Sequence, residues 1–178
     1  MRTGTNPIES ASAIFKHYKE LADKGMAQIS DEEFFRLPEP ESNSIAIIVK
    51  HVGGNLLSRW TDFLTTDGEK EWRNRDGEFE METMDRRQLM QLWERGWQAL
   101  FSSLGSLTGD DTGKIVTIRG EPHSVLEATN RSLAHISYHV GQIVLLAKMY
   151  RSAQWQNLTV PKKKSRELNE KMMGAKAR

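Results

Sequence analysis

The sequence contains no cysteine, and this absence removes several kinds of chemistry. Disulfide bonds, thiolate metal ligands and cysteine nucleophiles are all excluded. Any metal ion bound by this chain must therefore be held by nitrogen or oxygen atoms. Hydrophobic residues make up 38% and charged residues 28% of the 178-residue chain, which is ordinary for a globular domain with one core.

Long apolar segments are also missing. No segment approaches the roughly 18 consecutive apolar residues that a membrane-spanning helix requires. The first residues, MRTGTNPIESASAIF, lack the apolar stretch that is typical of a secretory signal. We therefore expect a cytoplasmic protein that does not associate with membranes.

The chain as a whole has no strong excess of charge, since its formal net charge is +1. Residues 161–178 nevertheless hold seven Lys or Arg and two Glu, so a basic tail follows a mildly acidic body. A short basic tail is more often a solvated end than a nucleic-acid arm. The pI near 8.0 and the lack of a recognisable motif also argue against nucleic-acid binding.

Helix-capping residues and apolar residues at helical spacing recur along the chain. Asn6 and Pro7 predict a first helix over residues 7–28, and Ser30 with Glu33 predicts a short helical turn through Phe35. Longer helices are predicted over residues 42–65, 83–107 and 122–151, with Thr83 as one cap and Pro122 in a first turn. The expected buried positions are Ala13, Ile14, Tyr18, Leu21 and Ala22 in the first helix, Ile45, Ile48, Val52, Leu56, Trp60 and Phe63 in the second long helix, and Leu89, Leu92, Trp93, Trp97, Leu100 and Phe101 in the third.

These elements predict an all-α fold, a four-helix bundle over residues 1–160. Residues 113–120, GKIVTIRG, alternate loosely and predict a short extended crossover. The long loops argue against the simplest up-down-up-down connections. The tail over residues 161–178 is expected to be partly helical or disordered, with a possible extra helix over residues 163–173.

Two histidines, His135 and His139, lie four residues apart in the apolar segment SLAHISYHVGQIVLLAKM. Side chains at this spacing share one helix face and can reach a single metal ion. His51, in IIVKHVGGNLL, lies on the flank of its own apolar stripe and offers a third ligand from a facing helix. Three histidines would leave coordination positions open, as catalytic sites require. For an HxxxH pair alone, however, packing in the core is the more common role.

Other residues near these histidines suggest a wider site. A metalloprotease would have glutamate directly after the first histidine, and Ile136 stands there instead, which argues against that mechanism. Candidate catalytic groups are Asn55 and Gln142, within helical reach of the histidines, and Asp76 and Glu78 in the polar loop WRNRDGEFE. Arg59, two turns after His51, is a candidate for binding an anion. Each of these also has a purely structural explanation, as a buried amide, a charged turn or an ion pair.

Four segments together resemble the DinB/YfiT-like superfamily of metalloenzymes, in a branch of unknown function. They are VKHVGGNLLSRW, WRNRDGEFE, IRGEPHSVLEA and HISYHVGQIVLLAK, and the resemblance extends from the first helix to about Arg151. It implies a four-helix bundle with a long crossover that often forms dimers. It also implies that His51, His135 and His139 bind Zn, Ni or Fe.

The resemblance implies a metal-dependent enzyme that acts on a small-molecule substrate, and specifically an S-transferase that uses a low-molecular-weight thiol. Two alternatives stay open from the sequence. One is a metal-dependent hydrolase that uses bound hydroxide. The other is a non-catalytic, stress-induced protein that binds metal or associates with DNA. A homodimer is also expected, because Trp72, Trp93, Trp97 and Trp155 offer more aromatic surface than one bundle obviously needs.

Overall fold

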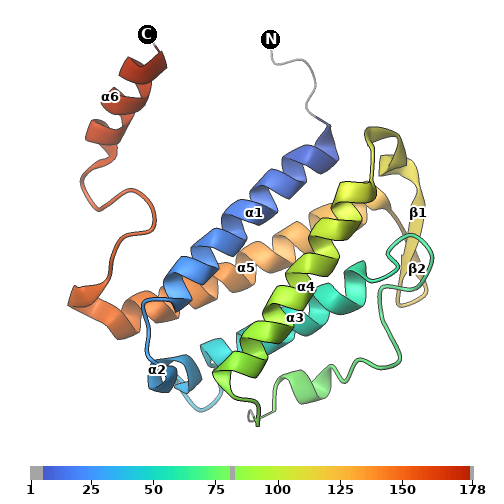
Figure 1. Ribbon diagram of the computed structural model, residues 1–178, viewed down its shortest axis with the longest axis horizontal. Helices are drawn as coiled ribbons and strands as arrows, with labels where there is room; N and C mark the ends of the chain where they lie inside the picture. The colour runs from blue at the N-terminus through green and yellow to red at the C-terminus, as the bar shows by residue number, and fades with distance from the viewer. Residues whose placement is uncertain (1–5, 81–82, 177–178) are drawn as a thin grey trace.

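Four long helices pack around a common core in the computed structural model, which describes residues 6–80 and 83–176 (Figure 1). Helix α3 packs against α4 and α5, and α1 packs against α5 and α4. Large side chains such as Phe15, Trp60 and Trp93 fill the space between them and are almost fully buried. The bounds of the long helices are α1 Pro7–Met26, α3 Ile45–Trp60, α4 Arg86–Ser106 and α5 Val125–Arg151.

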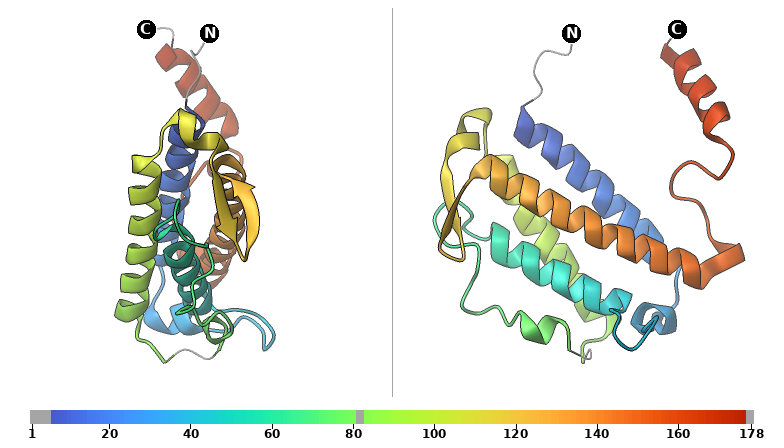
Figure 2. Two further views of the ribbon diagram at one scale, coloured as in Figure 1. Left: turned by 90° about the vertical axis from the view of Figure 1, so that its right-hand side faces the viewer. Right: turned by 180° about the vertical axis from the view of Figure 1, so that it is seen from behind.

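Shorter elements connect and extend these helices. A two-stranded antiparallel sheet precedes α5 and lies beside the end of α3, as Figure 2 shows from behind. The last helix, α6, lies apart from the four long helices in Figure 1, and the side chains described along it are exposed. The expectation of a mainly helical chain is confirmed, although it did not include a sheet. The shorter elements are α2 Asp31–Phe35, β1 Ile115–Ile118, β2 Glu121–Ser124, α6 Ser165–Lys176, and the 3₁₀ turns η1 Asp76–Glu78, η2 Gly109–Gly113 and η3 Ser152–Gln154.

The helix caps are partly as predicted. Ser30 and Glu33 form the expected capping box of α2, with each side chain bonded to the other residue's backbone N–H. The cap of α4 is Asp85 and not Thr83, because Asp85 and Gln88 satisfy each other's backbone N–H groups in the same way. Helices α1 and α3 also end earlier than predicted, at Met26 and Trp60.

The prediction that Pro122 lies in the first turn of a helix is wrong. Pro122 and His123 belong to β2, where Pro122 is paired with Thr117 of β1. Each strand of a two-stranded hairpin has an edge with no neighbouring strand, where a backbone N–H needs no partner in the sheet. Proline, which has no backbone N–H, is therefore tolerated in such a strand. Helix α5 begins only at Val125, with Ser124 and Glu127 as its capping box. The extended segment predicted over residues 113–120 is thus one strand of a hairpin.

The predicted buried stripe of α1 is only partly correct, because Ala22 is fully buried as expected but the other predicted positions are not. Ile14 is 40% exposed, Ala13 is exposed, and Tyr18 and Leu21 are only half-buried. The buried face is centred instead on Phe15, whose ring makes edge contacts with Trp60 and Trp97. All members of the stripe predicted for the second long helix are buried, although Phe63 lies beyond the end of α3. Of the positions predicted to be buried in α4, only Leu92 and Phe101 are less than fully buried.

The tryptophans provide less free surface than the sequence suggested. Trp93 and Trp97 are buried in the core, and Trp155 packs partly against it. Only Trp72 of the four is largely exposed, at 57%. The aromatic argument for a homodimer therefore fails for two of its residues, and the homodimer itself stays a prediction. Within the described residues, no helix is both long and apolar enough to cross a membrane.

Glycines let α3 and α4 approach each other closely. A Cβ atom on Gly53 would meet the Leu92 side chain at 3.0 Å and the Leu92 backbone at 3.2 Å. A Cβ atom on Gly96 would lie only 2.7 Å from the Gly53 carbonyl oxygen. Each helical glycine lowers the stability of the fold by roughly 1 kcal/mol relative to alanine. The close packing of the α3 and α4 backbones offsets this cost.

Gly96→Ala should therefore destabilise the protein by about 1–3 kcal/mol, because the added methyl group forces α3 and α4 apart. Gly105→Ala in the same helix is the control, since a Cβ atom there meets nothing within 4 Å. It should be neutral or stabilising by up to about 1 kcal/mol. Urea denaturation measures both variants, and equal stability of the two would contradict the close contact.

Asp67 holds the β1–β2 hairpin against the loop that follows α3. Its carboxylate accepts hydrogen bonds from the backbone N–H groups of Glu69, Arg119 and Gly120 at 2.7–2.8 Å. Partial burial works to raise the pKa of Asp67, but these hydrogen bonds favour the charged form and lower its pKa to about 2. The hairpin turn itself uses positive φ at Arg119 and Gly120, so Asp67 ties down a strained turn.

Asp67→Asn should lower the free energy of unfolding near pH 7 by about 1 kcal/mol, since partial exposure screens the interaction. Because the folded pKa is below the ordinary value of 3.8, the carboxylate stabilises the fold above about pH 4. This contribution is lost as the pH falls towards 2. The difference between wild type and Asp67→Asn, measured by denaturation from pH 6 to pH 2, should therefore shrink. Asp110→Asn, at an exposed position, is the control. A difference in unfolding free energy between wild type and Asp67→Asn that stays constant from pH 6 to pH 2 would refute the stabilising role of the Asp67 carboxylate.

Candidate metal centre

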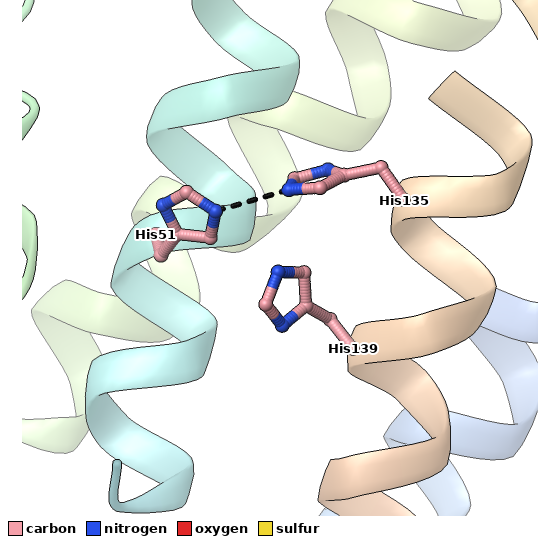
Figure 3. A group of neighbouring side chains, drawn as sticks. All are labelled: His51, His135 and His139. Carbon is pink, nitrogen blue, oxygen red and sulfur yellow. Dashed lines mark hydrogen bonds between the residues drawn. The ribbon is translucent and has the colours of Figure 1, made fainter. Parts of the chain in front are cut away.

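Three histidines converge between α3 and α5. His51 comes from α3, His135 and His139 come from successive turns of α5, and their rings face one another (Figure 3). The Nε2 atoms of His51 and His135 are 3.1 Å apart. One nitrogen from each of the three rings lies within 4.8 Å of the others. Nitrogen ligands of a tetrahedral ion are roughly 3.3 Å apart, given metal–nitrogen bonds of about 2.0 Å. Small rotations of the rings would therefore bring all three to one ion.

A buried carboxylate orients His51. Glu78 is 6% exposed, and its Oε2 atom lies 2.9 Å from Nδ1 of His51. Arg73 donates two further hydrogen bonds to the same carboxylate, from Nε to Oε1 at 2.8 Å and from Nη2 to Oε2 at 2.9 Å. Since the carboxylate accepts from Nδ1–H, the Nε2 atom of His51 presents its lone pair to the other histidines.

The charge state of Glu78 follows from these partners. Burial works to raise its pKa, but the hydrogen bonds from His51 and Arg73 and the positive charge of Arg73 outweigh it, so that the pKa is lowered. Glu78 is therefore an anion at neutral pH. A carboxylate bonded to the far nitrogen of a metal-ligating histidine is a common way to fix the ring and make it more basic.

Gly54 provides the space for this carboxylate. A Cβ atom on Gly54 would overlap Oε1 of Glu78 and lie 3.1 Å from its Cδ atom. The glycine pair in α3 thus has two uses, because Gly53 admits α4 on one side and Gly54 admits Glu78 on the other. Each glycine of the pair therefore has a close partner in the structure.

Gln142 orients His139 in a similar way. Its Oε1 atom lies 2.8 Å from Nδ1 of His139, one turn away on α5. With Nδ1–H donating to this amide oxygen, the Nε2 atom of His139 also carries a free lone pair. Burial lowers the pKa of His139 most, and the positive charge that His51 would carry lowers it further, although Gln142 opposes both. The ring is therefore neutral at ordinary pH.

His135 is half-buried, whereas His51 and His139 are buried. Burial and the neighbouring His139 and His51 lower its pKa to about 3, so it is neutral over the whole physiological range. Its Nδ1 atom is buried and has no hydrogen-bond partner. Three imidazoles that turn one ring nitrogen each towards one point, two of them with lowered pKa values, favour a cation between them.

A cavity of about 140 Å³ opens beside His51 and His135. Helices α3 and α5, the loop after α3 and the β1–β2 hairpin form its walls. Its lining contains side chains from one end of the molecule, where α3 ends and α5 begins. The residues are His51, Asn55, Arg59, Trp60, Phe63, Gly68, Arg75, Thr117, Ile118, Arg119, Ala128, Arg131, Ser132 and His135.

The predicted site residues fall into three groups. Asn55 and Arg59 line the cavity, on the helix face that carries His51. Glu78 and Gln142 contact the outer nitrogens of His51 and His139, so they are placed to position ligands and not to touch a substrate. Asp76 is exposed, two residues from Glu78, and it lines neither the cavity nor the histidine group.

Several site residues were not found in the sequence. Arg73 was seen only as part of a polar loop, although it holds Glu78 in place. The hairpin residues Thr117 and Arg119 were assigned to a crossover, so their place in the cavity wall was missed. Arg131 precedes His135 by one helical turn, and this spacing was a signal that could have identified it.

The family model of a protein family of unknown function, DUF1572, matches residues 2–164. The chain belongs to the DUF1572 family. The match covers all four long helices and continues past Arg151, where the resemblance noted in the sequence ended. No curated protein and no solved structure matched this DUF1572 protein. Membership therefore supplies no activity, and the histidine group is the feature from which a function must be argued.

Gly54→Ala should weaken metal binding by about 10- to 100-fold, because the methyl group displaces Glu78 from His51 while all three histidines stay in the sequence. Competition with a chromophoric chelator measures the affinity. Gly141→Ala on α5 is the matched control, since a Cβ atom there meets nothing within 4 Å. Unchanged affinity in a folded Gly54→Ala protein would show that the carboxylate does not support the site.

Proposed function

We propose that this protein is an enzyme that depends on a divalent metal ion, with His51, His135 and His139 as the ligands. The observation that carries the proposal is the convergence of three imidazoles, two of them with their outer nitrogens bonded, next to a cavity. A structural site would enclose its ion with four protein ligands, whereas three ligands leave a position for substrate. Nitrogen ligands suit Zn, Ni and Fe alike, so the metal is left open.

We further propose that the four long helices form a bundle of the DinB/YfiT-like type. The resemblance of the histidine-bearing segments to that superfamily supports this proposal, as does the pairing of α1 with α5 and of α3 with α4. From the same resemblance we propose an S-transferase that uses a low-molecular-weight thiol. A divalent ion held by neutral ligands lowers the pKa of a thiol that binds in its open position.

The residues around the site favour transfer from a thiol over hydrolysis. In hydrolysis, a general base that takes a proton from water is a frequent requirement. Glu78 is occupied by His51 and Arg73, and no Asp or Glu is found among the described residues that line the cavity. A thiol loses its proton to solvent far more easily than water does, and its sulfur then attacks the electrophile as the leaving group departs with the bonding electrons.

The ligand set is tested by elemental analysis of protein purified without added chelator. Wild type should contain about one divalent ion per chain, and His51→Ala, His135→Ala and His139→Ala should each lose most of it, since two imidazoles hold an ion weakly. His17→Ala, an exposed residue of α1, is the control. A full complement of metal in any of the three variants would remove that residue from the ligand set.

The reaction is tested separately by incubating the metal-loaded protein with a panel of small thiols and an electrophile such as 1-chloro-2,4-dinitrobenzene. The transferase proposal expects conjugate formation that depends on the thiol, the metal and His135. Hydrolysis of ester or amide substrates without any thiol-dependent turnover would favour the hydrolase instead.

A further inference from the structure

The lining of the cavity is strongly cationic. Arg59, Arg75, Arg119 and Arg131 all line it, together with two of the histidines at its inner end. Among the described residues of the lining, none is acidic. Guanidinium groups are spread over α3, α5, the loop after α3 and the β1–β2 turn, so the charge surrounds the cavity.

The nearby carboxylates do not balance this charge. Glu69 lies 3.6 Å from Arg59, 3.5 Å from Arg73 and 3.0 Å from Arg119, so three guanidinium groups share it. Asp67, two residues before Glu69, accepts hydrogen bonds from backbone N–H groups. Arg131 and Arg75 are exposed cations at the rim of the same cavity.

Arg59 is the buried member of the set, with a side chain that is 13% exposed. Its Nη1 atom is buried and has no hydrogen-bond partner, which is costly for a charged group. Burial lowers its pKa most, Glu69 opposes this, and the neighbouring arginines add to it, giving a pKa of about 10. Arg59 is therefore charged at neutral pH and has an unused donor.

Helical spacing aligns these arginines with the metal centre. On α3, His51, Asn55 and Arg59 follow one another at intervals of four residues, which is roughly 6 Å per step. On α5, Arg131 precedes His135 by the same interval. Because Arg59 and Arg131 line one cavity, the two helices place these residues roughly 6–12 Å from the histidines along the helix axes.

We infer that this cavity binds the oxyanion of a small substrate, a carboxylate or a phosphate, between Arg59 and Arg131, while the reactive end reaches the histidine group. Arg59 supplies the buried donor and Arg131 the charge from the facing helix, and planar guanidinium groups match both oxyanions. The cavity of about 140 Å³ is below the roughly 300–1,000 Å³ of sites for drug-sized ligands, so the substrate is small. The orientation of the reactive end rests on the proposed metal-dependent function, but the anion site does not.

The test is calorimetric titration with two probes, inorganic phosphate and succinate, on metal-loaded and chelator-treated wild type. The same titrations are made on Arg59→Gln and Arg131→Gln, with Arg95→Gln, an exposed residue of α4 outside the cavity, as the control. We expect at least one probe to bind wild type in both metal states. Each cavity variant should raise Kd by about tenfold or more, since a charge-assisted hydrogen bond is lost. Arg95→Gln should leave Kd unchanged.

The stronger of the two probes identifies the class of oxyanion. Equal Kd values in all four proteins, or no binding of either probe to wild type, would overturn the inference. Binding that vanishes whenever the metal is removed would place the anion on the metal and overturn it as well. If no metal is found but the arginine-dependent binding persists, the proposed enzyme fails and the anion site stands. Arg131 is exposed, so its variant keeps the test valid even where Arg59→Gln lowers the melting temperature.

Discussion

The buried chain of contacts from Arg73 through Glu78 to His51 determines the rest of the site. A carboxylate that is 6% exposed is costly to desolvate, and three hydrogen bonds with one guanidinium charge offset that cost. The same contacts fasten the irregular segment before α4 onto α3, and they fix which nitrogen of His51 is free. The absence of a side chain at Gly54 is what allows the carboxylate to lie there. The position of the loop, the tautomer of His51 and the glycine at position 54 therefore depend on one another.

Those parts of the fold that depend on local chemistry could be predicted from the sequence. The capping box of α2 and the apolar stripe of α3 are set by residues three or four positions apart, and both are confirmed. The hairpin was missed because its stability comes from pairing between strands and from the bonds of Asp67 to a turn some 50 residues away. Pro122 was misassigned for the same reason. In α1, apolar residues occur on more than one face, and only the rings of Trp60 and Trp97 decide that Phe15 points inward.

In the candidate site, too, features set by local sequence could be predicted and features set by tertiary contacts could not. The spacing of His135 and His139 is a local signal, and the position of His51 on its helix could be read from the apolar stripe. Glu78 and Asp76 looked equivalent in the sequence, because a loop has no periodic pattern to say which side chain turns inward. Arg73 selects Glu78 by holding its carboxylate, while Asp76 stays exposed. The close partners of Gly53 and Gly54, which are α4 and Glu78, depend on tertiary packing and could not be read from the sequence.

The balance of charge constrains the chemistry that this site can support. The imidazoles of His135 and His139 are neutral, and Arg73 already neutralises Glu78, so the described groups supply no spare negative charge to a divalent ion. The cavity beside it adds arginines, which makes the surroundings more positive. A cation in such a place is best stabilised by an anionic ligand in its open position, because charges attract strongly where water is excluded. A site in which a carboxylate is already a metal ligand has a weaker preference for a further anionic ligand. If the proposed ion and anion bind, neutral histidine ligands and a cationic entrance would act together to attract the anion and to keep it deprotonated.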